Sequence, residues 1–126
     1  MLIGPTALVV YRRAAYAPDR RFSRTRGWIN MGMWGALDRY KIEVGQYPTA
    51  EEGGLTALIQ HPPGLAQAST WKGPYARDAD DIRDPWGNDL LYQCPGQHHP
   101  DGYDLSSAGP DGKHGTADDI ANWQSP

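Results

Sequence analysis

The sequence predicts one small domain in which helical segments precede a short antiparallel pair of strands. The chain has 126 residues, which is the size of a single domain. Apolar residues recur with helical spacing before residue 60, and two short strand-like segments follow residue 88. The 15 Gly and 11 Pro indicate many turns, while 5 Trp and 7 Tyr supply apolar surface for a core.

Composition excludes several classes of protein. Cys94 is the single cysteine, so an internal disulfide framework and a multi-cysteine zinc site are excluded. No apolar run reaches the 18 residues typical of a transmembrane helix. Residues 31–126 carry 6 basic and 14 acidic side chains, which argues against nucleic acid as a partner. Residues 1–30 carry 6 Arg against one Asp. This basic N-terminal segment has three interpretations: a disordered arm, a contact with a membrane surface, or a segment outside the fold.

The first element is the end of a helix at residues 33–44. Residues spaced three and four apart mark one helical face: Trp34, Leu37, Tyr40, Lys41 and Val44. Gly45 follows at the position of a left-handed C-terminal cap, so the helix is expected to end at residue 44.

A second, shorter helix is expected at residues 50–60. Thr49 and Glu52 have the spacing of a capping box, in which each side chain accepts from the other's backbone N–H. Three apolar residues form its expected buried stripe: Leu55, Leu58 and Ile59. The sequence HPPG at residues 61–64 ends it.

A turn and two strands complete the expected fold. The DPWGN sequence at residues 84–88 predicts a turn, because proline presets φ and Gly or Asn can adopt positive φ. Residues 89–93 and 103–107 read as strands, joined by a loop at residues 96–102. An antiparallel pair is the simplest arrangement of these two strands.

The densest group of functional side chains lies near the C-terminus. Asp111, Asp118 and Asp119 occur in a Gly-rich stretch, and crowded carboxylates are costly unless a cation neutralises them. Ca²⁺ accepts such oxygen ligands, but the spacing is not that of an EF-hand. From spacing alone, an acidic surface loop that binds no ion explains these residues as well as a calcium site does.

The histidines and the cysteine offer weaker alternatives. His98 and His99 are adjacent, and neighbours on extended chain point to opposite faces, so they rarely bind one ion together. A zinc site of His98, His114 and an aspartate is a further hypothesis, and solvated loop histidines are the preferred interpretation. Cys94 is interpreted as a half-buried structural residue.

Seven sequence motifs together resemble one known family. They are ALDRYK (36–41), GQYPT (45–49), GLTAL (54–58), GPY (73–75), DPWGN (84–88), YDLSSAGPDG (103–112) and DDIANW (118–123). In this order they resemble the soluble head of the major pseudopilins of bacterial type II secretion, over about residues 34–126. DPWGN combined with the C-terminal motif is highly specific.

The resemblance implies an α+β fold, in which an N-terminal helix packs on a small antiparallel sheet and a calcium-binding loop lies near the C-terminus. Calcium ligands carried over by position are the carboxylates of Asp111, Asp118 and Asp119, with the carbonyls of Ala108 and Thr116. The resemblance also implies a non-enzymatic subunit of a periplasmic pseudopilus. Its expected partners are copies of itself, minor pseudopilins and the inner-membrane assembly platform, and the assembly supports export of folded proteins across the outer membrane.

Residues 1–33 depart from the family pattern. Members begin with a basic leader, a prepilin-peptidase site and Phe-Thr-Leu-Ile-Glu opening a hydrophobic helix of about 20 residues, which anchors them in the inner membrane. We expect residues 1–33 to be an unmatched basic segment, either disordered or the product of a frameshift or misassigned start. A soluble, calcium-dependent protein- or glycan-binding module that does not polymerise is the alternative function. A metallohydrolase using His98 or His114 is a third.

Overall fold

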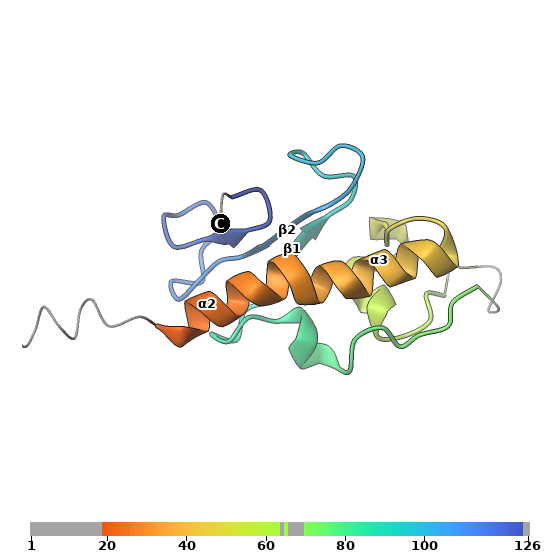
Figure 1. Cartoon of the computed structure of the whole chain (residues 1–126), viewed down its shortest axis with the longest axis horizontal. Helices are drawn as coiled ribbons and strands as arrows, with labels where there is room; N and C mark the ends of the chain where they lie inside the picture. The colour runs from red at the N-terminus through yellow and green to blue at the C-terminus, as the bar shows by residue number, and fades with distance from the viewer. Residues whose placement is uncertain (1–18, 64, 66–69, 125–126) are drawn as a thin grey trace, which may run out of the picture.

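The structure, a computed structural model, describes residues 19–63, 65 and 70–124. One long helix crosses a small sheet, and short helical turns and loops surround them (Figure 1). The helical elements are α2 (Arg20–Gly27), η1 (Trp28–Gly32), α3 (Met33–Val44), η2 (Ala50–Glu52), η3 (Gly54–Leu58) and η4 (Ala79–Ile82). The strands are β1 (Leu91–Gln93), β2 (Asp104–Ser107) and β3 (Ile120–Ala121). The predicted helix on a small antiparallel sheet is confirmed.

The long helix consists of α2, a π-helical turn η1 and α3 in direct succession. It begins at Asp19, whose side chain accepts from the N–H of Arg21 at 2.9 Å. It ends at Gly45, which adopts φ 110° and donates to the carbonyl of Lys41, so the predicted C-terminal cap is confirmed. Residues 20–33 of the segment set apart by sequence are therefore helix here, while residues 1–18 lie outside the described residues. The domain boundary itself stays a prediction.

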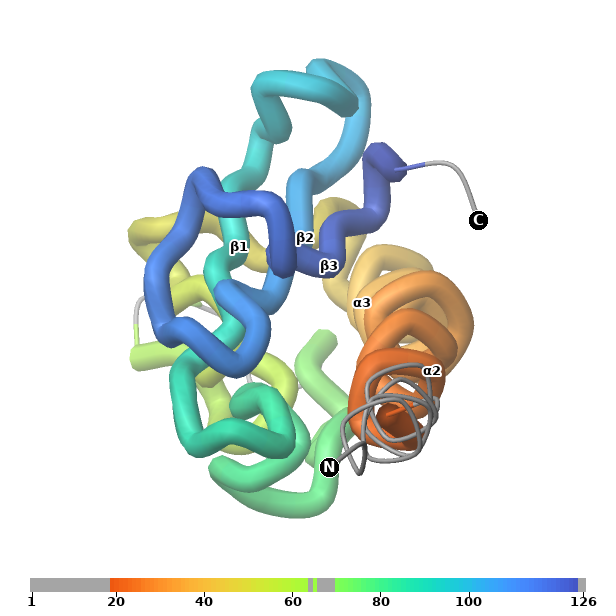
Figure 2. The backbone as a smooth tube through the Cα atoms, turned by 90° about the vertical axis from the view of Figure 1, so that its left-hand side faces the viewer, coloured from red at the N-terminus to blue at the C-terminus, as the bar shows by residue number. Residues whose placement is uncertain are grey.

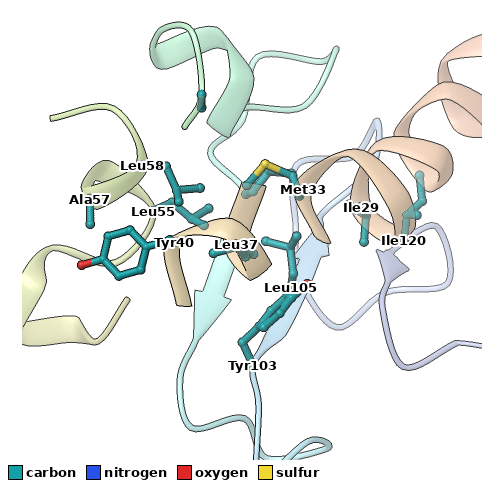
Figure 3. Close-up of a cluster of buried hydrophobic side chains, with 12 residues drawn as sticks. Ile29, Met33, Leu37, Tyr40, Leu55, Ala57, Leu58, Tyr103, Leu105 and Ile120 are labelled. Atoms are coloured by element: carbon teal, nitrogen blue, oxygen red, sulfur yellow. The ribbon is translucent and has the colours of Figure 1, made fainter. Parts of the chain in front are cut away.

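The helix buries one line of side chains against the sheet. Ile29, Met33, Leu37 and Tyr40 are completely buried, and Figure 3 shows Leu37 beside Leu105 and Ile29 beside Ile120. The prediction that Trp34 belongs to this face is wrong, because its side chain is 55% exposed. Trp34 lies one residue past Met33, which turns it about 100° away from the sheet. Lys41 is exposed for the same reason, one residue past Tyr40.

The sheet has the order β1-β2-β3, and both pairings are antiparallel. Tyr92 pairs with Leu105, and Ser106 pairs with Ala121. All four residues of β2 are buried, because this strand lies in the centre of the sheet (Figure 2). The predicted pair of strands is confirmed. The third strand was not predicted, since two residues are too few to show alternation.

The expected helix at residues 50–60 is instead two 3₁₀ turns, η2 and η3. The capping box is present, with 3.3 Å between Glu52 N and Thr49 Oγ1. Gly53 then adopts φ 97° and Gly54 φ 60°, left-handed conformations that interrupt an α-helix. Leu55 and Leu58 are buried as expected, whereas Ile59 is partly buried. In the HPPG sequence that was predicted to end this helix, Gly64 lies outside the described residues.

Candidate functional site: the C-terminal acidic loop

The acidic loop comprises residues 108–119 and joins β2 to β3 (Figure 2). Three of its glycines adopt positive φ: 74° at Gly109, 70° at Gly112 and 86° at Gly115. These conformations are costly for other residues, so the glycines let a short loop fold back on itself. Asp111 is exposed, while Asp118 and Asp119 are half-buried.

Thr116 joins two of the three predicted carboxylates. Its hydroxyl oxygen lies 2.6 Å from Asp118 Oδ1 and 3.2 Å from Asp119 Oδ1. The second oxygen of Asp119 accepts from the N–H of Gly115 at 2.6 Å. The structure therefore brings Asp118, Asp119 and the hydroxyl of Thr116 together by hydrogen bonds, and their role as ligands of one ion stays a prediction.

Asp111 approaches the same group from the start of the loop. Its backbone N–H donates to Asp118 Oδ2 at 3.1 Å. Its own carboxylate accepts from the N–H of Lys113 at 2.9 Å, and this bond, followed by one from the Thr116 hydroxyl, lowers the pKa of Asp111. Ala108 is completely buried at the base of the loop, and its neighbour Gly109 packs against the backbone of Asp118.

A buried network that the sequence analysis missed supports this loop. Asp84, the first residue of the DPWGN turn, accepts from the N–H groups of Trp86 and Asn88 at 3.1 and 2.9 Å. Its other oxygen accepts from the hydroxyl of Ser107 at 2.7 Å, and Ser107 Oγ in turn accepts from Gly109 N at 3.1 Å. The turn-initiating role of Asp84 is typical of aspartate. Its bond to Ser107 spans 23 residues and has no local sequence signal.

The donor chemistry of the loop fits a hard cation, because the candidate ligands are all oxygen atoms of carboxylate and carbonyl groups. The side chains are nonetheless held by hydrogen bonds within the loop. Over the described part of the chain, no three His, Cys, Asp or Glu side chains are grouped as a metal site.

His98 and His99 lie together on one carboxylate, contrary to the expectation that they point apart. Their Nδ1 atoms lie 3.0 and 3.1 Å from the two oxygens of Asp104, and both backbone N–H groups donate to it. The reason is that these residues lie in a bent loop and not in extended chain. The His98 ring also stacks on Trp123, with 4.1 Å between centroids. His114 is exposed in the acidic loop.

Because the carboxylate of Asp104 is buried and hydrogen-bonded, we expect the folded chain to lose stability in acid. Burial raises its pKa, but hydrogen bonds from the N–H of His98 and from both imidazoles outweigh burial and lower it below the ordinary value. A carboxyl group whose pKa is lower in the folded than in the unfolded state stabilises the fold at pH values above its unfolded-state pKa of about 3.9. This stabilisation is lost as the pH falls through the folded-state pKa. Urea midpoints at about pH 5 and pH 3 should therefore differ less in Asp104→Asn than in the parent chain. An equal acid-induced fall in both proteins would contradict this assignment.

Cys94 is a free thiol, partly buried against the core, as predicted for a structural cysteine.

Among the helices of the described residues, none combines the length and apolar character needed to cross a bilayer.

Comparison with known proteins identifies relatives of the whole head. The family described as type II secretion system protein G matches residues 26–123. A type II secretion system core protein G from Escherichia coli K12 is 47% identical over 90 residues, covering 70% of this chain and 58% of the relative. The Pseudomonas aeruginosa protein of that name is 36% identical over 128 residues, covering 98% of this chain and 86% of the relative. The chain thus spans a little over half of the E. coli relative.

A solved structure shares the fold. The crystal structure of the major pseudopilin from the type 2 secretion system of enterohaemorrhagic E. coli superposes with a TM-score of 0.64 at 32% identity. The match covers 85% of this chain and 92% of the other. The resemblance inferred from the seven motifs is confirmed, and the chain belongs to the type II secretion system protein G family.

Proposed function

We propose that this chain is a structural, non-catalytic subunit of a type II secretion pseudopilus. The observation that carries the proposal is the head fold, an N-terminal helix on a three-stranded antiparallel sheet, which is shared with a major pseudopilin at a TM-score of 0.64. The family match over residues 26–123 supports the same role. In this role the head presents fixed surfaces to neighbouring subunits.

The proposed partners are further copies of this chain, minor pseudopilins and the inner-membrane assembly platform, with the head in the periplasm. Strand β1 lies at an edge of the sheet and carries Leu91, which is 51% exposed. An exposed apolar side chain on a strand edge is a surface that a neighbouring subunit can cover. The assembled fibre would support export of folded proteins across the outer membrane.

Gene deletion tests this role in the source organism. Cells lacking the chain should retain exported proteins in the periplasm, and expression of the complete chain from a plasmid should restore them to the medium. Unchanged export in the deletion strain would contradict the proposal. An unrelated periplasmic enzyme, measured in the medium, controls for lysis.

The acidic loop is proposed to bind one Ca²⁺ through Asp111, Asp118 and Asp119, with the carbonyls of Ala108 and Thr116. Support comes from the oxygen-only donor set and from the grouping of Asp118 and Asp119 around Thr116, whose hydroxyl lies 2.6 Å from Asp118 Oδ1. The ion would neutralise the crowded carboxylates and hold the loop against the Ser107–Gly109 base.

Calcium is expected to raise the melting temperature of the chain by about 10 °C. A ligand specific for the folded state contributes about 2.7 kcal/mol at a hundredfold excess over its Kd. One kcal/mol shifts the melting temperature of a domain of this size by roughly 4 °C. Melts in EGTA, Ca²⁺ and Mg²⁺ measure the effect, which Asp118→Ala should abolish and Cys94→Ser should retain. A calcium response that survives in Asp118→Ala would disprove the assignment.

A further inference from the structure

A hollow lies between the long helix and the loop at residues 96–102. Its volume is about 560 Å³, within the range of about 300–1,000 Å³ that is typical of small-molecule sites. Its lining includes six polar or aromatic side chains: Asn30, Trp34, His98, His99, Asp101 and Asn122. The wall of the hollow therefore offers an aromatic ring together with amide, imidazole and carboxylate groups.

Trp34 supplies the aromatic surface of the hollow that is free to stack on a ligand. It is 55% exposed, and among the described residues it has no stacked ring, cation or hydrogen-bond partner. The two tyrosines of the lining are already occupied. Lys41 lies 4.8 Å from the ring centre of Tyr47, and the buried ring of Tyr103 lies 5.0 Å from that of Tyr47. The hollow thus presents one free aromatic face and not a cage of several.

The two imidazoles of the lining are held in place by a residue outside it. Asp104 accepts from Nδ1 of His98 at 3.0 Å and from Nδ1 of His99 at 3.1 Å. Because a carboxylate only accepts, each Nδ1 carries a proton, and Nε2 of a neutral ring is left as an acceptor. Trp123 stacks on the His98 ring, with 4.1 Å between centroids, and fixes its plane. These groups are therefore oriented before any ligand arrives, which reduces the entropy that binding costs.

We propose that this hollow binds a neutral oligosaccharide, with one pyranose ring lying on Trp34. A pyranose carries C–H groups on its faces and hydroxyl groups around its edge, so it needs one apolar platform surrounded by donors and acceptors. Trp34 supplies the platform. The imidazole, amide and carboxylate groups of the lining can each exchange a hydrogen bond with a hydroxyl group.

Other classes of ligand match this wall less well. A quaternary ammonium ion is best held by several aromatic faces, and Trp34 offers one. A phosphate would meet the exposed carboxylate of Asp101, and none of the described residues that line the hollow is Lys or Arg. Zinc sites use at least three protein ligands. Beside His98 and His99 the described part of the chain groups no third His, Cys, Asp or Glu for such a site.

NMR titration of the complete ¹⁵N-labelled chain tests this inference. Among cellotriose, maltotriose and the trimer of N-acetylglucosamine, at least one should move the indole resonance of Trp34 and the amide resonances of His98, His99 and Asp101. Trp34→Ala should weaken this binding about tenfold, because the ring loses its platform. Met31→Ala removes another exposed apolar side chain of the same helix, outside the hollow, and should bind like the parent. Thermal melts establish that both variants fold.

Asp101→Asn separates a sugar from a cation as the ligand. A hydroxyl group can still bond to the amide, so sugar binding should fall by no more than about threefold, whereas binding of choline, the cation probe, would be lost.

Four results would overturn the inference. They are no change with any of the three sugars, equal sugar affinity in Trp34→Ala and Met31→Ala, choline binding without sugar binding, and a Trp34-dependent dimer without sugar binding. The titrations contain no other secretion component, so their failure would leave the proposed pseudopilus role, which gene deletion tests, unaffected.

Discussion

Gly109→Ala is expected to destabilise the head by about 3 kcal/mol, a fall in melting temperature of roughly 12 °C. Gly109 adopts φ 74°, which alone strains any other residue. A Cβ atom added there would also fall on the backbone oxygen of Asp118, deep inside van der Waals contact, and 3.0 Å from its Cγ. The loop would have to move off its base to accommodate the methyl group. Thermal or urea unfolding measures the loss.

Gly115→Ala is the matched control. Gly115 has a similar φ of 86°, but an added Cβ would meet no atom within 4 Å. Its cost should therefore be the conformational strain alone, about 1 kcal/mol. If the two variants lost the same stability, the close packing of Gly109 on Asp118 would not hold in solution.

Leu37→Ala should cost about 3 kcal/mol, within the range of 2–5 kcal/mol found for buried leucines. Leu37 is completely buried between the helix and the sheet (Figure 3), so its removal leaves a cavity that neighbouring side chains fill only in part. Urea unfolding should show a lower midpoint with an unchanged slope, because the fold is retained.

Ile42→Ala on the same helix provides the comparison. Ile42 is 75% exposed, so its replacement should change stability by no more than about 0.5 kcal/mol. A loss in Ile42→Ala equal to that in Leu37→Ala would mean that the helix packs through a different face.

Local signals predicted the ends of elements well. The positive φ of Gly45 and the capping box of Thr49 depend on residues within one turn of chain, and both were predicted. The buried face of α3 was misassigned at Trp34, because tertiary packing selects among apolar positions that spacing alone leaves equivalent. The two positive φ values at Gly53 and Gly54 broke a helix that the apolar pattern favoured.

The candidate site shows the same division between local and distant information. The grouping of Asp118 and Asp119 around Thr116 could be predicted because these residues are close in sequence. The support from Asp84 could not, since its partner Ser107 lies on a different element. The convergence of His98 and His99 on Asp104 depends on the conformation of the loop at residues 96–102, whose position was predicted but whose bend was not.

The pairing of the C-terminal strand with the rest of the head determines when the domain can close during synthesis. Strand β3 contacts α2, and Ile120 belongs to the same buried cluster as Ile29, so the two ends of the described chain meet (Figure 3). Synthesis proceeds from the N-terminus, so the apolar line of the helix emerges long before its last cover does. The core of the head can therefore be completed only after β3 has been synthesised. A nascent chain, or one truncated before β3, would expose that apolar line to chaperones and proteases.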